Sequence, residues 1–345
     1  MNKNIVVTGG AGYIGSHVSV ELLRAGCNIL IIDDFSNSHP EAVRRIGELA
    51  PEGRVELLEC DLADAASAEG VVNAVQDFKA DGAVHLAGLK AVGESVAEPA
   101  RYYRVNIGSA LTLIRALEEA DAKLLVFSSS ATVYGELNEN PVKENGNTGA
   151  TNPYGRTKLF IEEILKDMAR SDDSWKITNL RYFNPVGADP SGRIGEDPHG
   201  VPNNLFPFIA QVAVGRREKL AVFGDDYDTP DGTGVRDYIH VSDLARGHVA
   251  AVKHLDDLQK GGAFDVNLGT GNGSSVLEAI GAFQRASNRE IKYDIVARRD
   301  GDVAEIYADA DLARDLYGWS AERNLDDMCT DHWRWQNGNP NGYKP

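Results

Sequence analysis

Tyr154 and Lys158 have the residue types and the spacing of an acid–base pair. Pro153 precedes them, and proline favours the first turn of a helix, so we expect a helix over about 153–170 that carries both side chains on one face. A tyrosine with the ordinary pKa of ~10 is a poor base at neutral pH, and lowering that pKa to about 7 requires ~4 kcal/mol of preferential phenolate stabilisation. A neighbouring ammonium can contribute to this stabilisation of the phenolate. The same spacing also occurs among plain surface side chains, so its meaning depends on the surrounding elements.

Glycines at positions 9, 12 and 15 suggest a phosphate-binding turn. They connect an expected strand at 4–8 to an expected helix at 13–25. Gly9, Gly12 and Gly15 would permit a tight turn, a close approach of backbone to a pyrophosphate and close packing of helix on strand. The alternative is a tight turn without a ligand.

Asp33 and Asp34 end the second expected strand, within the ~20 residues at which a dinucleotide-binding turn places its acidic partner. Asp33 would accept hydrogen bonds from an adenosine ribose and repel a 2′-phosphate. The sequence therefore predicts NAD rather than NADP as the cofactor, and its cationic nicotinamide would add to the stabilisation of a phenolate. The alternative is a solvated strand end.

Short runs rich in Val, Ile and Leu alternate with longer segments of helical period, which predicts an α/β fold built on a Rossmann-type doubly wound parallel sheet. We expect residues 1–180 to form an NAD-binding Rossmann domain and residues 181–345 to form mainly a smaller C-terminal α/β substrate domain, with some segments returning to the first. The Pro/Gly-rich stretch 184–204 is more typical of a ligand-covering segment than of a linker. The expected strands are 4–8, 28–32, 83–86, 123–127 and 263–267, and the expected helices are 13–25, 63–78, 100–120 and 153–170.

The 345 residues carry 52 acidic and 35 basic side chains, a net charge of −17. Nucleic acid and anionic membrane surfaces would be repelled, and we expect neither as a partner. No apolar run approaches the ~18 residues of a membrane span, and a strand from residue 4 leaves no room for a signal peptide, so we expect a cytoplasmic protein. The three cysteines are far apart, which predicts buried thiols, and we expect no metal site.

Several longer segments carry a family resemblance. Together with the glycine pattern, the serine run 128–130 and the Tyr154/Lys158 pair, they resemble the extended short-chain dehydrogenase/reductases, and within them the UDP-galactose 4-epimerase family, over nearly the whole chain. The segments are residues 85–95, 127–135, 180–187, 202–205 and 231–240.

The resemblance implies a tightly held NAD that is reduced and reoxidised within one turnover, acting on UDP-galactose and UDP-glucose. Tyr154, as phenolate, would remove the proton from the sugar 4-OH, and Ser130 would hydrogen-bond the same oxygen. Lys158 would bind the nicotinamide ribose and lower the pKa of the tyrosine. The flat 4-keto sugar would then rotate and receive the hydride on its other face.

The resemblance also implies the binding residues. Ile306 would line the pocket beside the sugar C2 substituent, where a tyrosine restricts family members to glucose and galactose and a small residue admits N-acetylhexosamines. The implied NAD contacts are Gly9, Gly12, Tyr13, Ile14, Gly15, Asp33, Asn37, Ser38, Asp61, Leu62, Ala87, Lys90, Lys158 and Phe183. The implied contacts to the sugar nucleotide are Ser130, Tyr154, Asn184, Asn204, Leu205, Phe223, Arg236, Arg299, Asp302 and Ile306.

Family enzymes of this type usually form homodimers through two helices per subunit, here 100–120 and 153–170. The second carries an apolar stripe wide enough for both core and partner. The stripe consists of Phe160, Ile161, Ile164, Leu165 and Met168.

Three other functions remain to be weighed. An epimerase acting on UDP-N-acetylhexosamines would share all of these motifs. A nucleotide-sugar 4,6-dehydratase would carry an Asp-Glu pair after the serine, where this chain has Ala131 and Thr132. A non-enzymatic NAD-sensing regulator would be expected to lose the tyrosine, which is present.

Overall fold

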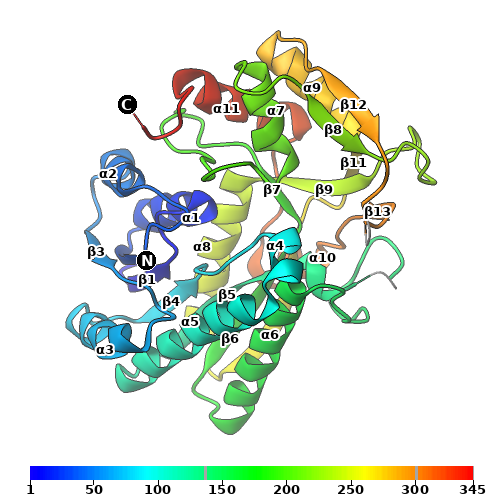
Figure 1. Ribbon diagram of the computed structural model, residues 1–345. Helices are drawn as coiled ribbons and strands as arrows, with labels where there is room; N and C mark the ends of the chain where they lie inside the picture. Colours follow the sequence, from blue (N-terminus) through cyan, green and yellow to red (C-terminus); the bar gives the residue numbers. More distant parts are fainter. Residues whose placement is uncertain (136–137, 300–301, 345) are drawn as a thin grey trace.

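Seven parallel strands form the central sheet of the computed structural model, which describes residues 1–135, 138–299 and 302–344. Their order is β10-β6-β5-β4-β1-β2-β3, and every neighbouring pair is parallel (Figure 1). The order reverses between β1 and β4, the kind of switch point at which such sheets bind ligands. The predicted Rossmann-type doubly wound sheet is thereby confirmed. The strands are β1 (Asn4–Thr8), β2 (Asn28–Asp33), β3 (Val55–Glu59), β4 (Gly82–His85), β5 (Leu124–Ser130), β6 (Lys176–Tyr182) and β10 (Gly262–Leu268).

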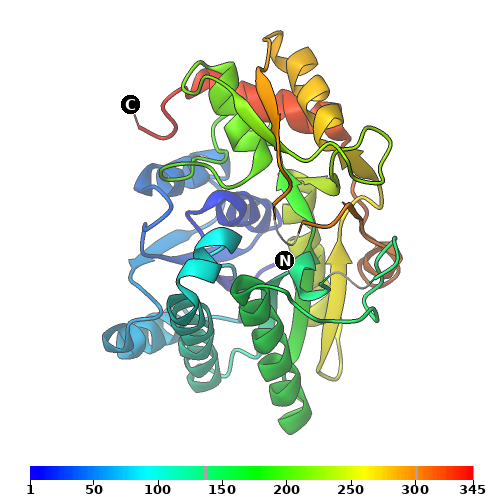
Figure 2. The ribbon, with the colours of Figure 1, turned by 45° about the vertical axis from the view of Figure 1, so that its right-hand side comes forward.

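Helices cover both faces of this sheet because successive side chains of each strand point to opposite sides. In β5, Val126 belongs to one hydrophobic core and Phe127 to the other. The first core packs under α1 (Tyr13–Arg24), α2 (Pro40–Leu49), α8 (Val241–Asp257) and α10 (Asp311–Tyr317). The second packs under α3 (Ala68–Asp77), α5 (Pro99–Glu119) and α6 (Pro153–Ser171), which lie side by side in Figures 1 and 2.

A smaller α/β part lies beyond the C-terminal edge of the central sheet (Figure 2). Its central strand β9 pairs in parallel with β7 and β13 and antiparallel with β11, while β8 and β12 form a separate parallel pair. Its elements are β7 (Asn184–Val186), α7 (Leu205–Ala213), β8 (Leu220–Phe223), β9 (Val235–His240), β11 (Gly273–Ser275), α9 (Val276–Ser287), β12 (Tyr293–Val296), β13 (Glu305–Ile306) and α11 (Leu325–Gly338).

All five predicted strands and all four predicted helices are present, with shifted ends. The helix predicted at 63–78 is instead a short 3₁₀ turn, Ala65–Ser67, followed by α3. Within the first 182 residues, helices α2 and α4 (Val92–Ala97) and strands β3 and β6 were not predicted, and beyond them only β10 was predicted. The division of the chain at residue 180 into a cofactor unit and a substrate unit stays a prediction.

Over the described ranges, no helix is long and apolar enough to cross a lipid bilayer. Cys27 and Cys329 are buried and Cys60 is half-buried, and all three are free thiols.

Candidate active site

The three predicted catalytic residues meet where β5 ends and α6 begins. Ser130 is the last residue of β5, and α6 starts at Pro153 behind the N-cap Asn152, whose side chain accepts from the N–H of Gly155 at 2.9 Å. The Ser130 hydroxyl lies beside the phenol of Tyr154 and lowers its pKa. The ammonium of Lys158, one turn further along α6, lies 5.9 Å from the centre of the Tyr154 ring. The geometry therefore joins a phenol, a hydroxyl and an ammonium in one site.

Lys158 is held in place from several sides. Its Nζ donates to the carbonyl of Ser128 at 2.6 Å and lies 4.9 Å from the centre of the Phe127 ring. Burial lowers the pKa of Lys158 to about 8, and the Glu162 carboxylate opposes this shift. A pKa near 8 leaves most of the ammonium protonated at pH 7.

Burial also acts on Tyr154, in the direction that disfavours a base. It raises the pKa of the phenol above its ordinary value, while the hydrogen bond from Ser130 works against this rise. Because burial penalises the phenolate, a nearby positive charge is needed to make the tyrosine a base at neutral pH. Lys158 is the protein group placed to supply it.

The glycine turn exposes backbone N–H groups at the start of α1. Gly12 is the N-cap residue, and within the described ranges no side chain caps this helix end. Close packing requires glycine at the other two positions: φ of Gly9 is +66°, and a Cβ on Gly15 would lie 2.0 Å from the carbonyl oxygen of Gly9. Uncapped N–H groups and the helix dipole favour an anion, so this turn fits the pyrophosphate of a dinucleotide.

Asp33 lies next to this turn and is buried. Its Oδ2 accepts from the N–H of Ala11 at 2.9 Å. Its Oδ1 accepts from the N–H of Phe35 at 3.0 Å and from the hydroxyl of Ser38 at 2.6 Å. A carboxylate has about four lone-pair sites, so capacity remains for a ribose hydroxyl. The charge and position of Asp33 therefore fit NAD.

Other predicted NAD contacts follow the C-terminal ends of neighbouring strands. Asp61 and Leu62 come after β3, Ala87 and Lys90 after β4, and Phe183 directly after β6. Since the carboxyl ends of parallel strands share one edge of the sheet, the fold brings these residues to the edge that holds Asp33 and Ser130.

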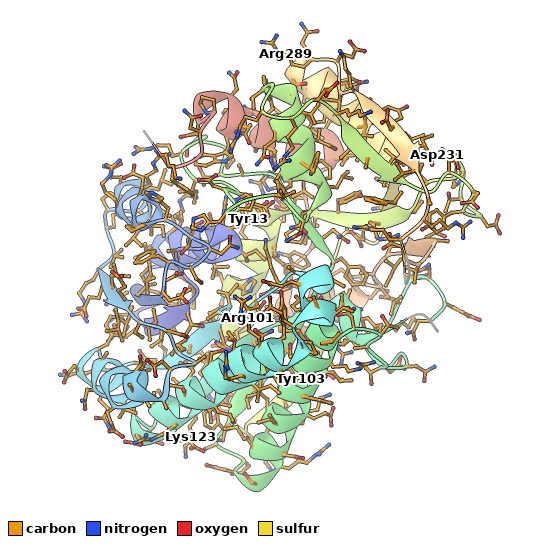
Figure 3. The ribbon with its side chains drawn as sticks, viewed as in Figure 1. Tyr13, Arg101, Tyr103, Lys123, Asp231 and Arg289 are labelled. Carbon is orange, nitrogen blue, oxygen red and sulfur yellow. The ribbon has the colours of Figure 1, made fainter. Side chains whose placement is uncertain are left out.

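Two contacts connect this edge to the segment 184–204. Tyr13, at the start of α1 beside Ile14 and labelled in Figure 3, donates its hydroxyl to the carbonyl of Gly187 at 2.8 Å. Asn37 accepts through Oδ1 from the N–H of His199 at 3.1 Å. The segment that the sequence predicts to cover a ligand thus lies against predicted cofactor residues.

The predicted contacts to the sugar nucleotide form a charged cluster in the smaller part. The carboxylate of Asp302 accepts a hydrogen bond from Nε of Arg299 at 3.0 Å and lies 3.7 Å from Nη2 of Arg236. The Arg299 guanidinium lies over the ring of Phe223, 4.5 Å from its centre. Ile306 pairs with Arg236 across β13 and β9.

The remaining predicted contacts lie near this cluster in the fold. Ile306 packs against the small core that contains Phe183, a predicted cofactor residue. Asn184 begins β7, which pairs with β9, the strand of Arg236. Asn204 is the N-cap of α7 and Leu205 its first residue.

Glu196, which the sequence did not single out, connects the two predicted sets. Its Oε1 accepts from Nζ of Lys90 at 3.1 Å and from Nδ2 of Asn204 at 3.3 Å, and it is buried. Only its position within the segment 184–204 pointed to it.

No group of three or more His, Cys, Asp or Glu side chains among residues 1–135, 138–299 and 302–344 could hold a metal ion.

A nucleotide cradle beside a half-buried tyrosine and serine and a buried lysine defines a class of NAD-dependent enzymes. The chain belongs to the NAD dependent epimerase/dehydratase family, whose sequence profile matches residues 5–269. Its relatives include the UDP-glucose 4-epimerase of Bacillus subtilis (strain 168), 52% identical over 344 residues that cover 99% of this chain and 98% of the relative. The UDP-glucose 4-epimerase of Mus musculus is 53% identical over 348 residues, 99% of each chain.

The crystal structure of UDP-glucose 4-epimerase from Bifidobacterium longum in complex with NAD⁺ and UDP is similar to the whole fold, with a TM-score of 0.93. Its sequence is 49% identical, and the match covers 98% of this chain and 99% of that chain. The family resemblance of the sequence is thereby confirmed.

Proposed function

We propose that this protein is a UDP-glucose 4-epimerase, an isomerase that interconverts UDP-galactose and UDP-glucose with NAD as its cofactor. The observation that carries the proposal is the contact of Tyr154 with Ser130 beside the buried ammonium of Lys158, at the sheet edge that also holds the glycine turn. The full-length similarity to enzymes of this name supports it.

The side chains supply the proton transfer. Tyr154 in its phenolate form takes the proton of the sugar 4-OH, and Ser130 hydrogen-bonds the same oxygen. Lys158 stabilises the phenolate through its positive charge, and its Nζ is fixed by the carbonyl of Ser128. When bound, NAD supplies the reversible hydride acceptor that oxidation and reduction at C4 require. For the return step, Tyr154 gives the proton back to the same oxygen.

The residues at the sheet edge would hold the cofactor. The N–H groups at Gly12 and the start of α1 would bind its pyrophosphate, and Asp33 would accept from its adenosine ribose. Lys158 would bind the nicotinamide ribose. The other NAD contacts proposed are the sequence-predicted ones at the ends of β2, β3, β4 and β6.

The sugar nucleotide is held by the smaller part. Arg236 and Arg299 offer two cations to one diphosphate, and charge-assisted hydrogen bonds are the strong ones. Asp302, which now contacts both arginines, holds them near each other before the substrate arrives. Phe223, which is 37% exposed, gives the uracil base an aromatic face. We also propose residues 1–180 as the cofactor unit and 181–345 as mainly the substrate unit.

We further propose a cytoplasmic homodimer that acts in galactose metabolism and pairs through α5 and α6. Most of the apolar stripe of α6 faces the core, where Ile161 and Leu165 are each 1% exposed. Phe160 remains 46% exposed and stacks with Tyr103 of α5, labelled in Figure 3, at a ring separation of 6.0 Å. Leu111 of α5 is 49% exposed, which extends this apolar surface. Analytical ultracentrifugation should give twice the chain mass, and Phe160→Glu should give a monomer.

The dehydratase alternative lacks a suitable acid and base. After Ser130 the chain continues in a 3₁₀ turn, Ala131–Val133, in which the Thr132 hydroxyl donates to Ser130 Oγ at 3.0 Å. A methyl group and a hydroxyl committed to Ser130 cannot remove and return protons at C5 and C6 of a sugar. The regulator alternative does not account for Tyr154 lying beside the buried ammonium of Lys158.

Conversion of UDP-galactose tests the function directly. The purified protein is incubated with UDP-galactose without added NAD, and the anomeric sugar signals are followed by NMR. We expect UDP-glucose to form until the two sugar nucleotides reach equilibrium, and the same mixture to form when the reaction starts from UDP-glucose. A 4-keto-6-deoxy sugar would indicate a dehydratase instead, and unchanged UDP-galactose would refute the proposal.

A further inference from the structure

A buried ion pair lies directly behind the catalytic residues. Glu162 is fully buried and Arg181 is 1% exposed. The Arg181 guanidinium donates Nε to Oε1 of Glu162 at 3.0 Å and Nη2 to Oε2 at 2.7 Å, a two-pronged contact. The hydroxyl of Ser129 also donates to Oε1 of Glu162. Three donors from two neighbouring strands thus converge on one carboxylate of α6.

The register of the sheet explains this convergence. Ser129 of β5 pairs with Arg181 of β6, so both side chains project from the same face of the sheet, the face that α6 covers. Glu162 lies four residues after Lys158 and eight after Tyr154, on the same side of α6. The carboxylate is therefore placed between the sheet and the helix that carries the proposed base.

We propose that Glu162 is a positioning residue for the epimerase reaction: its carboxylate fixes α6 to the serine run at the end of β5 and keeps a negative charge one turn from the Lys158 ammonium. The proposal rests on the proposed function. By holding Ser129, Glu162 also fixes the positions of Ser128 and Ser130 on either side of it. Ser128 accepts the hydrogen bond of Lys158, and Ser130 contacts Tyr154. Glu162 thereby acts on the reacting oxygen only through other residues.

The surroundings of Lys158 show why the charge matters. Lys158 faces Tyr154 on its own helix and His85 on β4, while the hydroxyl of Tyr182 on β6 pairs with His248 of α8. Burial lowers the pKa of His85 to about 3 and raises that of Tyr182, so both are neutral at pH 7. Glu162 is the group whose charge raises the pKa of Lys158. Without it, the ammonium would lose its proton at a lower pH.

The groups around Glu162 itself are cations. Arg181 holds it from β6, and Lys166 of α6 lies 3.8 Å from Oε2. Both cations also contact Asp265 of β10, Arg181 at 2.7 Å and Lys166 at 2.9 Å. Asp265 therefore offers a matched comparison: it is a second carboxylate on the same arginine, but it has no contact with Ser129 and lies on a different element from Lys158.

The test compares Glu162→Gln with Asp265→Asn in the NAD-loaded full chain. Each variant removes one of the two carboxylates on Arg181, but only the first removes the charge one turn from Lys158. For each we measure the pH profile of kcat with UDP-galactose, the KM and the thermal midpoint. The ionisation of Tyr154 is followed in parallel by ultraviolet difference absorbance against the matching Tyr154→Phe variant, a measurement that needs no substrate.

We expect Glu162→Gln to lower kcat at pH 8 by about fivefold with little change in KM, and to move the alkaline limb of the profile to lower pH by about one unit. A neutral Lys158 no longer stabilises the phenolate, so kcat falls as the pH rises through the pKa of Lys158, until the phenolate forms without the cation at still higher pH. A lower pKa of Lys158 therefore moves this fall to lower pH. Tyr154 should ionise at higher pH. Asp265→Asn should leave the profile and the tyrosine ionisation in place.

A structural role alone would lower the thermal midpoint in both variants and leave both pH readouts unmoved, and this result would overturn the proposal. If Glu162→Gln does not fold because Arg181 is left under-compensated, the double variant Glu162→Gln/Arg181→Met removes both charges of the pair. An alkaline limb at the wild-type position in that variant would equally overturn it. If the wild-type protein fails to convert UDP-galactose, the proposed function is wrong, while the tyrosine titration still tests Glu162.

Discussion

Removing the charge of Lys158 should make the phenolate of Tyr154 rare at neutral pH. The ammonium lies 5.9 Å from the centre of the tyrosine ring, and for unit charges at this distance an effective dielectric constant of ~20 gives about 3 kcal/mol. This energy corresponds to about two pKa units. Lys158→Met is therefore expected to lower kcat about a hundredfold at pH 7.

The pH dependence distinguishes this cause from a simple loss of structure. Burial already raises the pKa of Tyr154, and removing a neighbouring cation raises it further, so the phenolate fraction of the variant must increase as the pH rises. The deficit in kcat should therefore shrink by about tenfold for each pH unit until the raised pKa is reached. Arg156→Met is the matched control, because Arg156 carries the same charge on the same turn of α6 but is exposed.

The assay is the initial rate of UDP-glucose formation from saturating UDP-galactose between pH 6 and about pH 10. NAD released on denaturation is quantified in the same samples, since Lys158 is also a proposed ribose contact, and rates are expressed per bound NAD. A Lys158→Met enzyme that keeps more than a third of wild-type kcat at pH 7 would refute the reasoning. So would a deficit of equal size at every pH.

Three further predictions follow from the same site. Tyr154→Phe should fold and retain NAD but lose about 10²–10⁴-fold in kcat, the usual cost of removing a general acid–base group; more than a tenth of the wild-type rate would contradict the assignment. Denaturing the purified protein should release NAD, because the Asp33 carboxylate repels a 2′-phosphate, and chromatography showing mainly NADP would defeat this role. Ile306 packs against the core that contains Phe183 and is stiffer and bulkier than a serine, so UDP-N-acetylglucosamine should be turned over more weakly than UDP-glucose, by roughly tenfold to a few hundredfold in kcat/KM. Ile306→Ser should raise kcat/KM for UDP-N-acetylglucosamine relative to that for UDP-glucose, and Ile306→Tyr should abolish N-acetyl turnover. Unchanged ratios in both variants would show that Ile306 does not determine the specificity.

The sheet could be predicted where the strands are buried on both faces. β1, β2 and the first four residues of β5 contain continuous apolar runs, the pattern of a strand covered by helices on either side. β3 shows no such run because it is the edge strand, with Leu57 44% exposed and a glutamate on either side of the Leu57–Leu58 pair. β6 is buried, yet its polar positions Thr178, Asn179 and Arg181 interrupt the hydrophobic pattern. Arg181 can stand there because Glu162 compensates its charge.

Some residues of the candidate site could likewise be predicted from the sequence, and others could not. Tyr154 and Lys158 were found because one helix holds them at a spacing that the sequence displays, and the glycine turn because its local geometry tolerates few other residues. Glu196 and Glu162 act through partners that are distant along the chain, Lys90 in the first case and Arg181 in the second, and a single glutamate in a sequence carries no sign of such a partner. Burial is what gives these two carboxylates their effect, because a charge removed from water interacts strongly with the few groups around it. The residues that perform the chemistry can thus be predicted from their local spacing in the sequence. The residues that hold them in place can be identified only when the sheet register and the helix faces are known.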